Sequence, residues 1–155
     1  MCGSKRTMGT DEARGWKKPG ECWTGRCSKF HVVLETPDPG DAFACWRLLE
    51  RNGYDVSWCP GPNRSQAGPC PLVESGRCKL VEDASVVVSS LNLQRSSSRR
   101  VVLALERHLP DVPVIVVANG SASEQWPELL AGRRTLRAPV TAESLLASVK
   151  EALAG

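Results

Sequence analysis

The sequence has no long apolar run, and this absence sets its first limits. No stretch of its 155 residues approaches the roughly 18 to 20 apolar residues that a membrane-spanning helix needs. The N-terminus also has no apolar core behind its first basic residues, so no secretory signal is expected. We therefore expect a cytoplasmic protein without membrane contact, with a length suited to one globular domain and a tail.

The excess of positive charge is small and confined to one end of the chain. The net charge is +3, and residues 1–29 hold seven Lys or Arg against three acidic residues. A nucleic-acid-binding surface would normally gather basic residues on one folded face, so binding of DNA or RNA is not expected. Residues 1–28 also lack any period of 2.0 or 3.6 residues, which predicts a flexible N-terminal tail.

Short apolar runs begin at Phe30 and alternate with helix signals. The runs predict five strands, at residues 31–34, 54–58, 84–88, 112–117 and 133–137. Parallel strands need crossover connections, and right-handed crossovers place helices on both faces of a sheet. The pattern therefore predicts an α/β fold with a doubly wound, five-stranded parallel sheet. The last strand is weakly apolar, so we expect it at an edge.

Capping residues mark where the helices begin. Asp38 followed by Pro39 is typical of a helix N-terminus, and Asn52-Gly53 can end that helix. Ser97 or Ser98 is expected to cap a second helix, which runs through Leu109. Two more N-caps are predicted, at Ser121, for a short helix ending near Gly132, and at Thr141, for the last helix.

The order and spacing of these units resemble the receiver domain of bacterial two-component response regulators. The most specific features are the proline-led apolar run at 112–117 and Ala138-Pro139-Val140 directly after the fifth strand. The resemblance covers residues 31–154 and implies a receiver-like domain over residues 29–155. It also implies a flavodoxin-like strand order, with helices on both faces of the sheet.

In the family that the sequence resembles, an aspartate at the end of the third strand accepts a phosphoryl group from a phosphorelay, beside acidic residues that hold a magnesium ion. The resemblance places Glu35 and Thr36 at the acidic-pair position, with Asp38 slightly beyond. Ser89 stands where the aspartate would be, and residues 86–91 contain no Asp or Glu. A serine hydroxyl is a poor nucleophile without a base, so no phosphotransfer is expected.

A hydroxyl after the fourth strand and a lysine after the fifth complete the receiver site, and neither stands at its position here. Ala118 takes the hydroxyl position and Ala138 the lysine position, although Arg137 keeps a cation one residue earlier. The sequence therefore predicts a non-phosphorylatable signalling module, a pseudo-receiver without enzymatic activity. Its signal would pass through protein contacts, at the fifth strand and last helix, to a protein partner or to a second copy in a homodimer.

A cysteine-rich insertion, at about 59–83, lies between the second and third strands. It contains an internal echo in which Cys70-Pro71-Leu72-Val73-Glu74 is followed, eight residues on, by Cys78-Lys79-Leu80-Val81-Glu82. Helix signals are poor throughout the insertion. Cys59 can add a third sulfur to those of Cys70 and Cys78.

These cysteines are open to three interpretations. Cys59, Cys70 and Cys78 could bind zinc or an iron–sulfur cluster, cycle between thiol and disulfide, or pack as small apolar side chains. A metal site needs about four ligands, and the further candidates are Cys45 in the first helix and Cys22 and Cys27 in the tail. The alternative function is therefore a metal-binding or thiol-redox sensor.

Overall fold

The computed structural model describes residues 30–62 and 69–155. The predicted tail at 1–28, with its three cysteines, lies outside the described residues. Among the helices that are described, none has the length and apolar content needed to cross a bilayer.

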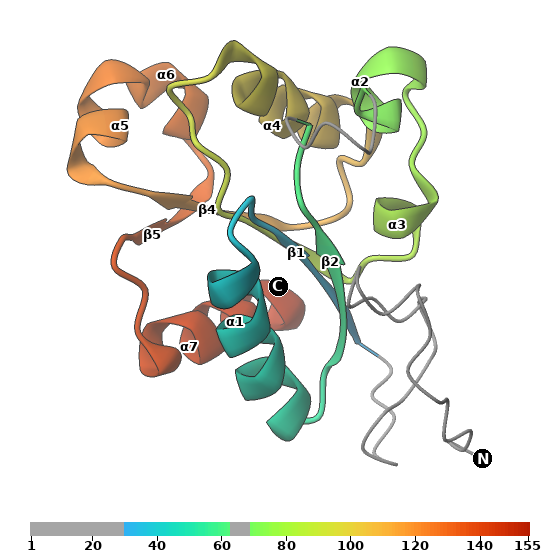
Figure 1. Cartoon of the computed structure of the whole chain (residues 1–155), viewed down its shortest axis with the longest axis vertical. Coiled ribbons are helices and arrows are strands. Elements are labelled where there is room, and N and C mark those ends of the chain that lie inside the picture. Colours follow the sequence, from blue (N-terminus) through green and yellow to red (C-terminus); the bar gives the residue numbers. More distant parts are fainter. Residues whose placement is uncertain (1–29, 63–68) are drawn as a thin grey trace.

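Five parallel strands form one sheet in the order β2-β1-β3-β4-β5 (Figure 1). Each strand lies within two residues of its predicted position, as β1 (His31–Glu35), β2 (Asp55–Cys59), β3 (Val86–Ser89), β4 (Val114–Ala118) and β5 (Arg134–Arg137). The chain leaves β1 toward β2 and later returns to the other side of β1 with β3. The order therefore reverses at β1, which confirms the doubly wound sheet and places β5 at an edge, as predicted.

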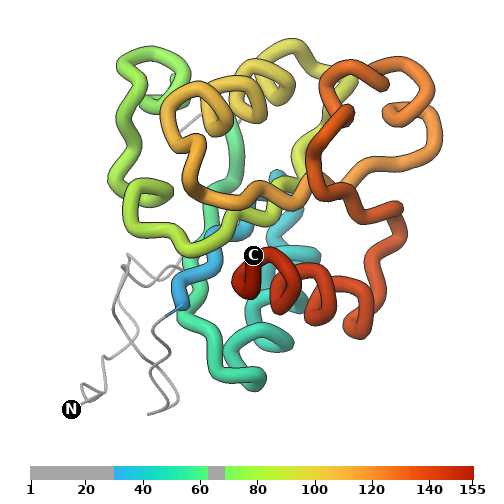
Figure 2. The backbone as a smooth tube through the Cα atoms, turned by 180° about the vertical axis from the view of Figure 1, so that it is seen from behind, coloured from blue at the N-terminus to red at the C-terminus, as the bar shows by residue number. Residues whose placement is uncertain are grey.

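Helices cover both faces of this sheet (Figures 1 and 2). One face is covered by α1 (Pro39–Arg51) and α7 (Ala142–Ala154), and both pack on a core that contains Val32, Leu34 and Ile115. The other face is covered by five helices, α2 (Pro71–Ser75), α3 (Lys79–Glu82), α4 (Ser96–His108), α5 (Gly120–Gln125) and α6 (Pro127–Leu130). Alternation along β1 directs Val33 toward this second face.

Helix α1 begins where the sequence predicted. The Asp38 side chain accepts hydrogen bonds from the backbone N–H groups of Gly40 (2.7 Å) and Asp41 (3.0 Å). The apolar stripe of α1 buries Ala42, Trp46 and Leu49 against the sheet. This cap fixes the path of the chain directly after β1, next to the candidate site.

Two predicted caps were wrong. Helix α4 begins at Ser96, one turn earlier than a Ser98 cap would allow, and its N-cap is Arg95, whose side chain makes no capping hydrogen bond. In the turn before the helix, the Asn92 side chain accepts from the backbone N–H of Gln94 (3.0 Å). Ser98 is buried in the helix. Helix α5 is capped by Asn119, whose side chain accepts from the backbone N–H of Ala122 (2.8 Å), so Ser121 lies inside the helix.

The helix predicted to run from Ser121 to near Gly132 is two short helices. Pro127 lacks a backbone N–H and disfavours helical geometry at Trp126, where the chain breaks between α5 and α6. The guanidinium carbon of Arg99, on α4, lies 3.9 Å from the centre of the Trp126 ring. Arg99 also donates to the Leu93 carbonyl (2.7 Å), and these contacts hold α4 against the α5–α6 turn.

The cysteine-rich insertion contains two short helices that poor helix signals did not predict. Helix α2 begins directly after Cys70 and α3 directly after Cys78, so each copy of the repeat forms one helix. Pro71 suits the first position of α2, and Gly76 ends it with φ +76°. The Leu72 and Val81 side chains, one from each helix, are buried in the core under α4.

Candidate functional site

The carboxyl ends of three neighbouring strands, β2, β1 and β3, lie side by side at one end of the sheet. In the strand register, Glu35 on β1 pairs with Cys59 on β2 and with Ser89 on β3. The strand order reverses at β1, and doubly wound folds place their ligand sites at the carboxyl ends of the strands beside such a reversal. The register therefore brings the predicted receiver position Ser89 next to Glu35 and to one of the cysteines.

Glu35 is a buried acid that forms no ion pair with any residue that the structure describes. Its side chain is 3% exposed, and burial raises its pKa from 4.5 to about 7. The neighbouring Ser89 hydroxyl offsets part of this rise. Nevertheless, neither Glu35 Oε2 nor Ser89 Oγ completes a hydrogen bond with any described residue. The acid is therefore largely uncharged below pH 7, and its environment differs from that of a magnesium ligand.

Thr36, at the acidic-pair position, and Asp38, slightly beyond it, both make local hydrogen bonds. The Asp38 carboxylate caps α1, as described above. The Thr36 hydroxyl accepts from the Asp38 backbone N–H (3.3 Å), and the Thr36 carbonyl accepts from Trp58 Nε1 (2.8 Å). The structure thus gives Glu35 and Asp38 separate surroundings, one in the core and one on the surface.

The remaining receiver positions lie at the ends of β4 and β5. The backbone N–H of Ala138 donates to the Ala118 carbonyl (3.0 Å), and neither methyl side chain can bind an anion. Arg137 is exposed, and its guanidinium extends over the backbone of Gly120, at the start of α5. Of these three residues, only Arg137 carries a positive charge, and its side chain is on the surface.

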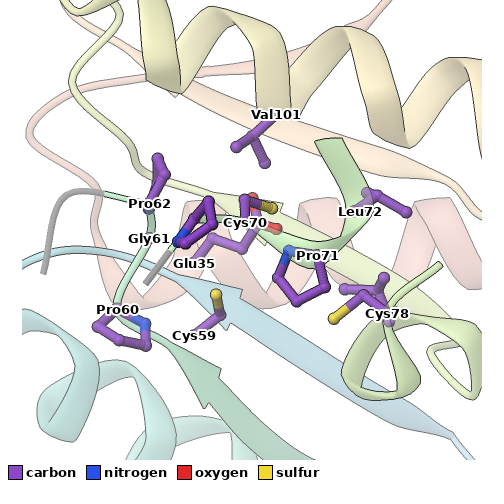
Figure 3. Close-up of a pocket in the computed structure, with 12 residues that line it drawn as sticks. Glu35, Cys59, Pro60, Gly61, Pro62, Cys70, Pro71, Leu72, Cys78 and Val101 are labelled. Atoms are coloured by element: carbon purple, nitrogen blue, oxygen red, sulfur yellow. The ribbon is translucent and has the colours of Figure 1, made fainter. Parts of the chain in front are cut away.

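A cavity of about 80 Å³ lies beside Glu35, on the sheet face covered by α2, α3 and α4 (Figure 3). Cys59, Cys70 and Cys78 all line it, so the structure brings together the three cysteines that the sequence singled out. The other lining residues are mostly apolar, namely Pro60, Gly61, Pro62, Pro69, Pro71, Leu72, Val81 and Val101. Gly61 has φ +86° and a Cβ there would lie 2.7 Å from Leu91, so the turn after β2 requires glycine.

Sequence reasoning missed that Glu35 lines this cavity. We treated Glu35 as a weakened magnesium ligand, whereas its side chain extends into the thiol-lined space. The period of two along β1 was the available signal, because it places Glu35 on the same face as the buried Val33.

Two thiols of this cavity, those of Cys59 and Cys70, are not activated. Burial, followed by the nearby Glu35 carboxyl, raises the pKa of Cys59 to about 12. Burial also raises the pKa of Cys70. Cys59, Cys70 and Cys78 are each half-buried, and thiols of high pKa are slow nucleophiles at neutral pH.

The predicted zinc or iron–sulfur site is not preformed in the part of the chain that the structure describes. Within residues 30–62 and 69–155, no group of three or more His, Cys, Asp or Glu side chains has an arrangement that could hold a metal ion. Cys45, the predicted fourth ligand from the first helix, packs instead on the opposite core, under α1. Cys22 and Cys27 lie outside the described residues.

Comparison with known proteins gives a likeness in structure but not in sequence. No family model and no curated protein matches the sequence. A response regulator receiver domain protein from Clostridium thermocellum matches with a TM-score of 0.62 and 16% identity, over 81% of this chain and 94% of that chain. A CheY-like receiver domain protein from Methanospirillum hungatei gives a TM-score of 0.60 and 18% identity, over 82% and 95%. A structure described as adenylate cyclase from Rhodopirellula baltica gives 0.61 and 13%, over 80% and 87%.

The sheet order, the two helical layers and these matches define a doubly wound α/β protein of the flavodoxin-like class. More particularly, the chain has the fold of response-regulator receiver domains. Identities of 13% to 18% establish the fold alone, so function has to be argued from the site.

Proposed function

We propose that this domain is a receiver-like signalling module that works through protein contacts and does not accept a phosphoryl group. The observation that carries the proposal is the uncharged end of β3. Ser89 is buried there, and the acid beside it, Glu35, is held in an environment that favours its neutral form.

Phosphoryl transfer needs stabilisation of the negative charge on the transferring oxygens, from a metal ion and cationic or hydrogen-bonding groups. The Glu35 carboxyl is buried, whereas the Asp38 carboxylate caps α1 on the surface. The side chains of Ala118 and Ala138 cannot hydrogen-bond. The carboxyl beside Ser89 Oγ is that of Glu35, which is largely neutral below pH 7 and in that form cannot act as the base that a serine nucleophile needs. No catalytic step is part of this proposal.

The face formed by β5 and α7 is the proposed contact surface. Strand β5 is an edge strand whose ladder partner is β4, so its outer backbone groups are open to another chain. An ion pair between Arg134 and Glu151 (3.1 Å) joins β5 to the exposed side of α7. The buried side of α7, with Leu145 and Val149, is already used by the core. A protein partner or a second copy would therefore bind backbone edges and charged side chains.

Incubation of the full chain with acetyl phosphate and Mg²⁺, followed by intact mass spectrometry, tests the absence of phosphotransfer. We expect no phosphorylated species, either for the wild type or for the Ser89→Ala variant. A hydroxylamine-sensitive acyl phosphate on this domain would overturn the proposal.

The contact surface has a separate test. Sedimentation equilibrium over a range of protein concentrations reports whether a homodimer forms, and Arg137→Glu changes the charge of the proposed face without touching the core. If a dimer forms, we expect this variant to weaken it, whereas Arg107→Glu, at an exposed position of α4 on the opposite face of the sheet, serves as the charge control. A dimer that is insensitive to Arg137→Glu would place the interface elsewhere.

A second candidate function, thiol-redox sensing, is favoured by one observation: three cysteines line the same cavity. Hydrogen peroxide would oxidise two of these thiols to a disulfide, itself being reduced to two waters, and the bond would cross-link the insertion to itself or to β2. Thiol counting after peroxide treatment tests this, with Cys59→Ser, Cys70→Ser and Cys78→Ser against Cys45→Ser as the control. Unchanged thiol counts in the wild type would remove this candidate.

A further inference from the structure

The cavity beside Glu35 contains a polar group without a partner in an otherwise apolar space. The walls come from four sources, the end of β2 with the turn after it, α2, α3 and α4 (Figure 3). In the close-up, Pro60, Gly61 and Pro62 lie on one side and Pro71 and Leu72 on the other, with Glu35 between them. The Glu35 carboxyl is buried and its Oε2 atom makes no hydrogen bond to a described residue.

Among the described residues that line the cavity, Glu35 is the one with a strongly hydrogen-bonding side chain. The titratable side chains that line the space with it are Cys59 at the end of β2, Cys70 before α2 and Cys78 before α3. Strand β3 contributes the Ser89 hydroxyl and α4 contributes the apolar Val101. Within residues 30–62 and 69–155, the influences on the pKa of Glu35 are burial and the Ser89 hydroxyl, and no cation of these residues is among them. Thiols bind hydrogen-bonding groups weakly, so they add little to this role.

A protonated carboxyl in an apolar cavity selects a particular kind of partner. It has one O–H donor and one carbonyl acceptor side by side. A primary amide presents the complementary acceptor and donor, so the two groups can pair through two hydrogen bonds. Burial of this acid without any partner costs free energy, and a ligand that completes its hydrogen bonds would recover part of that cost.

The cavity volume limits the size of the ligand. The cavity of about 80 Å³ is several times the volume of about 10 to 15 Å³ that a single water needs, so it has room for a few waters or for a small molecule of about five non-hydrogen atoms. The apolar walls favour a hydrocarbon group over such waters, because water at these positions finds few hydrogen-bonding partners.

We propose that this cavity is a binding site for a small, uncharged, largely apolar molecule whose amide, or a similar group that both donates and accepts, pairs with the Glu35 carboxyl. The site is distinct from the proposed contact surface on β5 and α7, and from the receiver positions at Ala118 and Ala138. Its occupancy would fix the insertion against β1 and β2, because the same ligand would touch Cys59 and Leu72.

Titration of the full chain with three probes of matched size tests this site. Propionamide is uncharged, propionate is an anion, and propylamine is a cation at neutral pH. Chemical-shift changes of backbone amides near Glu35, Cys59 and Cys70 report binding. At pH 6 we expect propionamide to shift these amides in a saturable way, with weaker effects from both charged probes.

The pH dependence and three variants make the test specific. Ionisation of Glu35 removes its donor, so we expect binding of propionamide to weaken by about tenfold or more at pH 8.5. Glu35→Gln keeps an uncharged donor and acceptor and should bind equally at both pH values, whereas Glu124→Gln, on the exposed surface of α5, should behave as wild type. Tighter binding of propylamine than of propionamide, or unchanged propionamide binding in Leu72→Trp, whose larger ring would fill the cavity, would overturn the proposal.

Discussion

Replacement of Glu35 by glutamine gives the most quantitative prediction from this structure. The variant retains the shape of the side chain but cannot ionise. In the wild type, the pKa of Glu35 is about 7 in the folded protein against 4.5 as its usual value. Because each pKa unit corresponds to about 1.4 kcal/mol, ionisation in the folded state costs about 3 kcal/mol more than in the unfolded chain.

The sign of this effect follows from proton binding. Between pH 4.5 and pH 7 the folded protein holds a proton at Glu35 that the unfolded chain has released. The stability contributed by Glu35 is therefore fully present below pH 4.5 and is lost as the pH rises through 7. Relative to the Glu35→Gln variant, the wild type should lose about 3 kcal/mol of unfolding free energy over this window.

Urea denaturation of both proteins at pH 5, 6, 7 and 8.5 measures this difference directly. Glu124→Gln is the matched control, because its carboxyl is exposed and its difference from wild type should stay constant with pH. A free-energy difference between wild type and Glu35→Gln that does not change between pH 5 and pH 8.5 would refute the assignment of Glu35 as a buried, unpaired acid.

Other predictions concern single contacts. Asp38→Ala should lower the unfolding free energy by about 1 kcal/mol, through loss of the α1 cap, as measured by urea denaturation at neutral pH. Arg99→Ala should cost about 1 to 2 kcal/mol, because it removes the contact with the Trp126 ring and a hydrogen bond, and Trp fluorescence should report the change. Cys59 should react with iodoacetamide far more slowly than Cys45 in the folded protein at pH 8, and mass spectrometry of peptides after timed quenching measures both rates. Burial and the nearby Asp41 also raise the pKa of Cys45, but the pKa of Cys59 rises to about 12, so equal rates would contradict the larger rise at Cys59. Leu105→Ala should lower the unfolding free energy by about 2 to 5 kcal/mol, as measured by thermal unfolding, because this α4 side chain is fully buried against the sheet.

The fold could be predicted from the sequence because its local signals agree with one another. Strand β1 and helix α1 were located by the apolar run at 31–34, the Asp38 cap and the turn at Asn52-Gly53. Strand β5 was placed at an edge because it is weakly apolar. These features need only period and capping chemistry, and each is decided within about ten residues.

The parts that could not be predicted depend on contacts between distant segments. The caps of α4 and α5 were misplaced because several Ser and Asn residues compete locally, and tertiary packing buries Ser98. The helices of the insertion were missed because four- and five-residue helices carry too few positions for a period. The cavity beside Glu35 is lined by Cys59, Leu72 and Val101, which come from three separate elements.

The central claim, that the end of β3 cannot bind a phosphoryl group, has a direct test. Beryllofluoride with Mg²⁺ imitates an aspartyl phosphate, and backbone amide spectra of the full chain report whether it binds. Our account predicts that the amides of Ser89, Ser90 and Ala118 keep their positions at saturating concentrations of both. Saturable shifts of these amides that require both Mg²⁺ and beryllofluoride would contradict it.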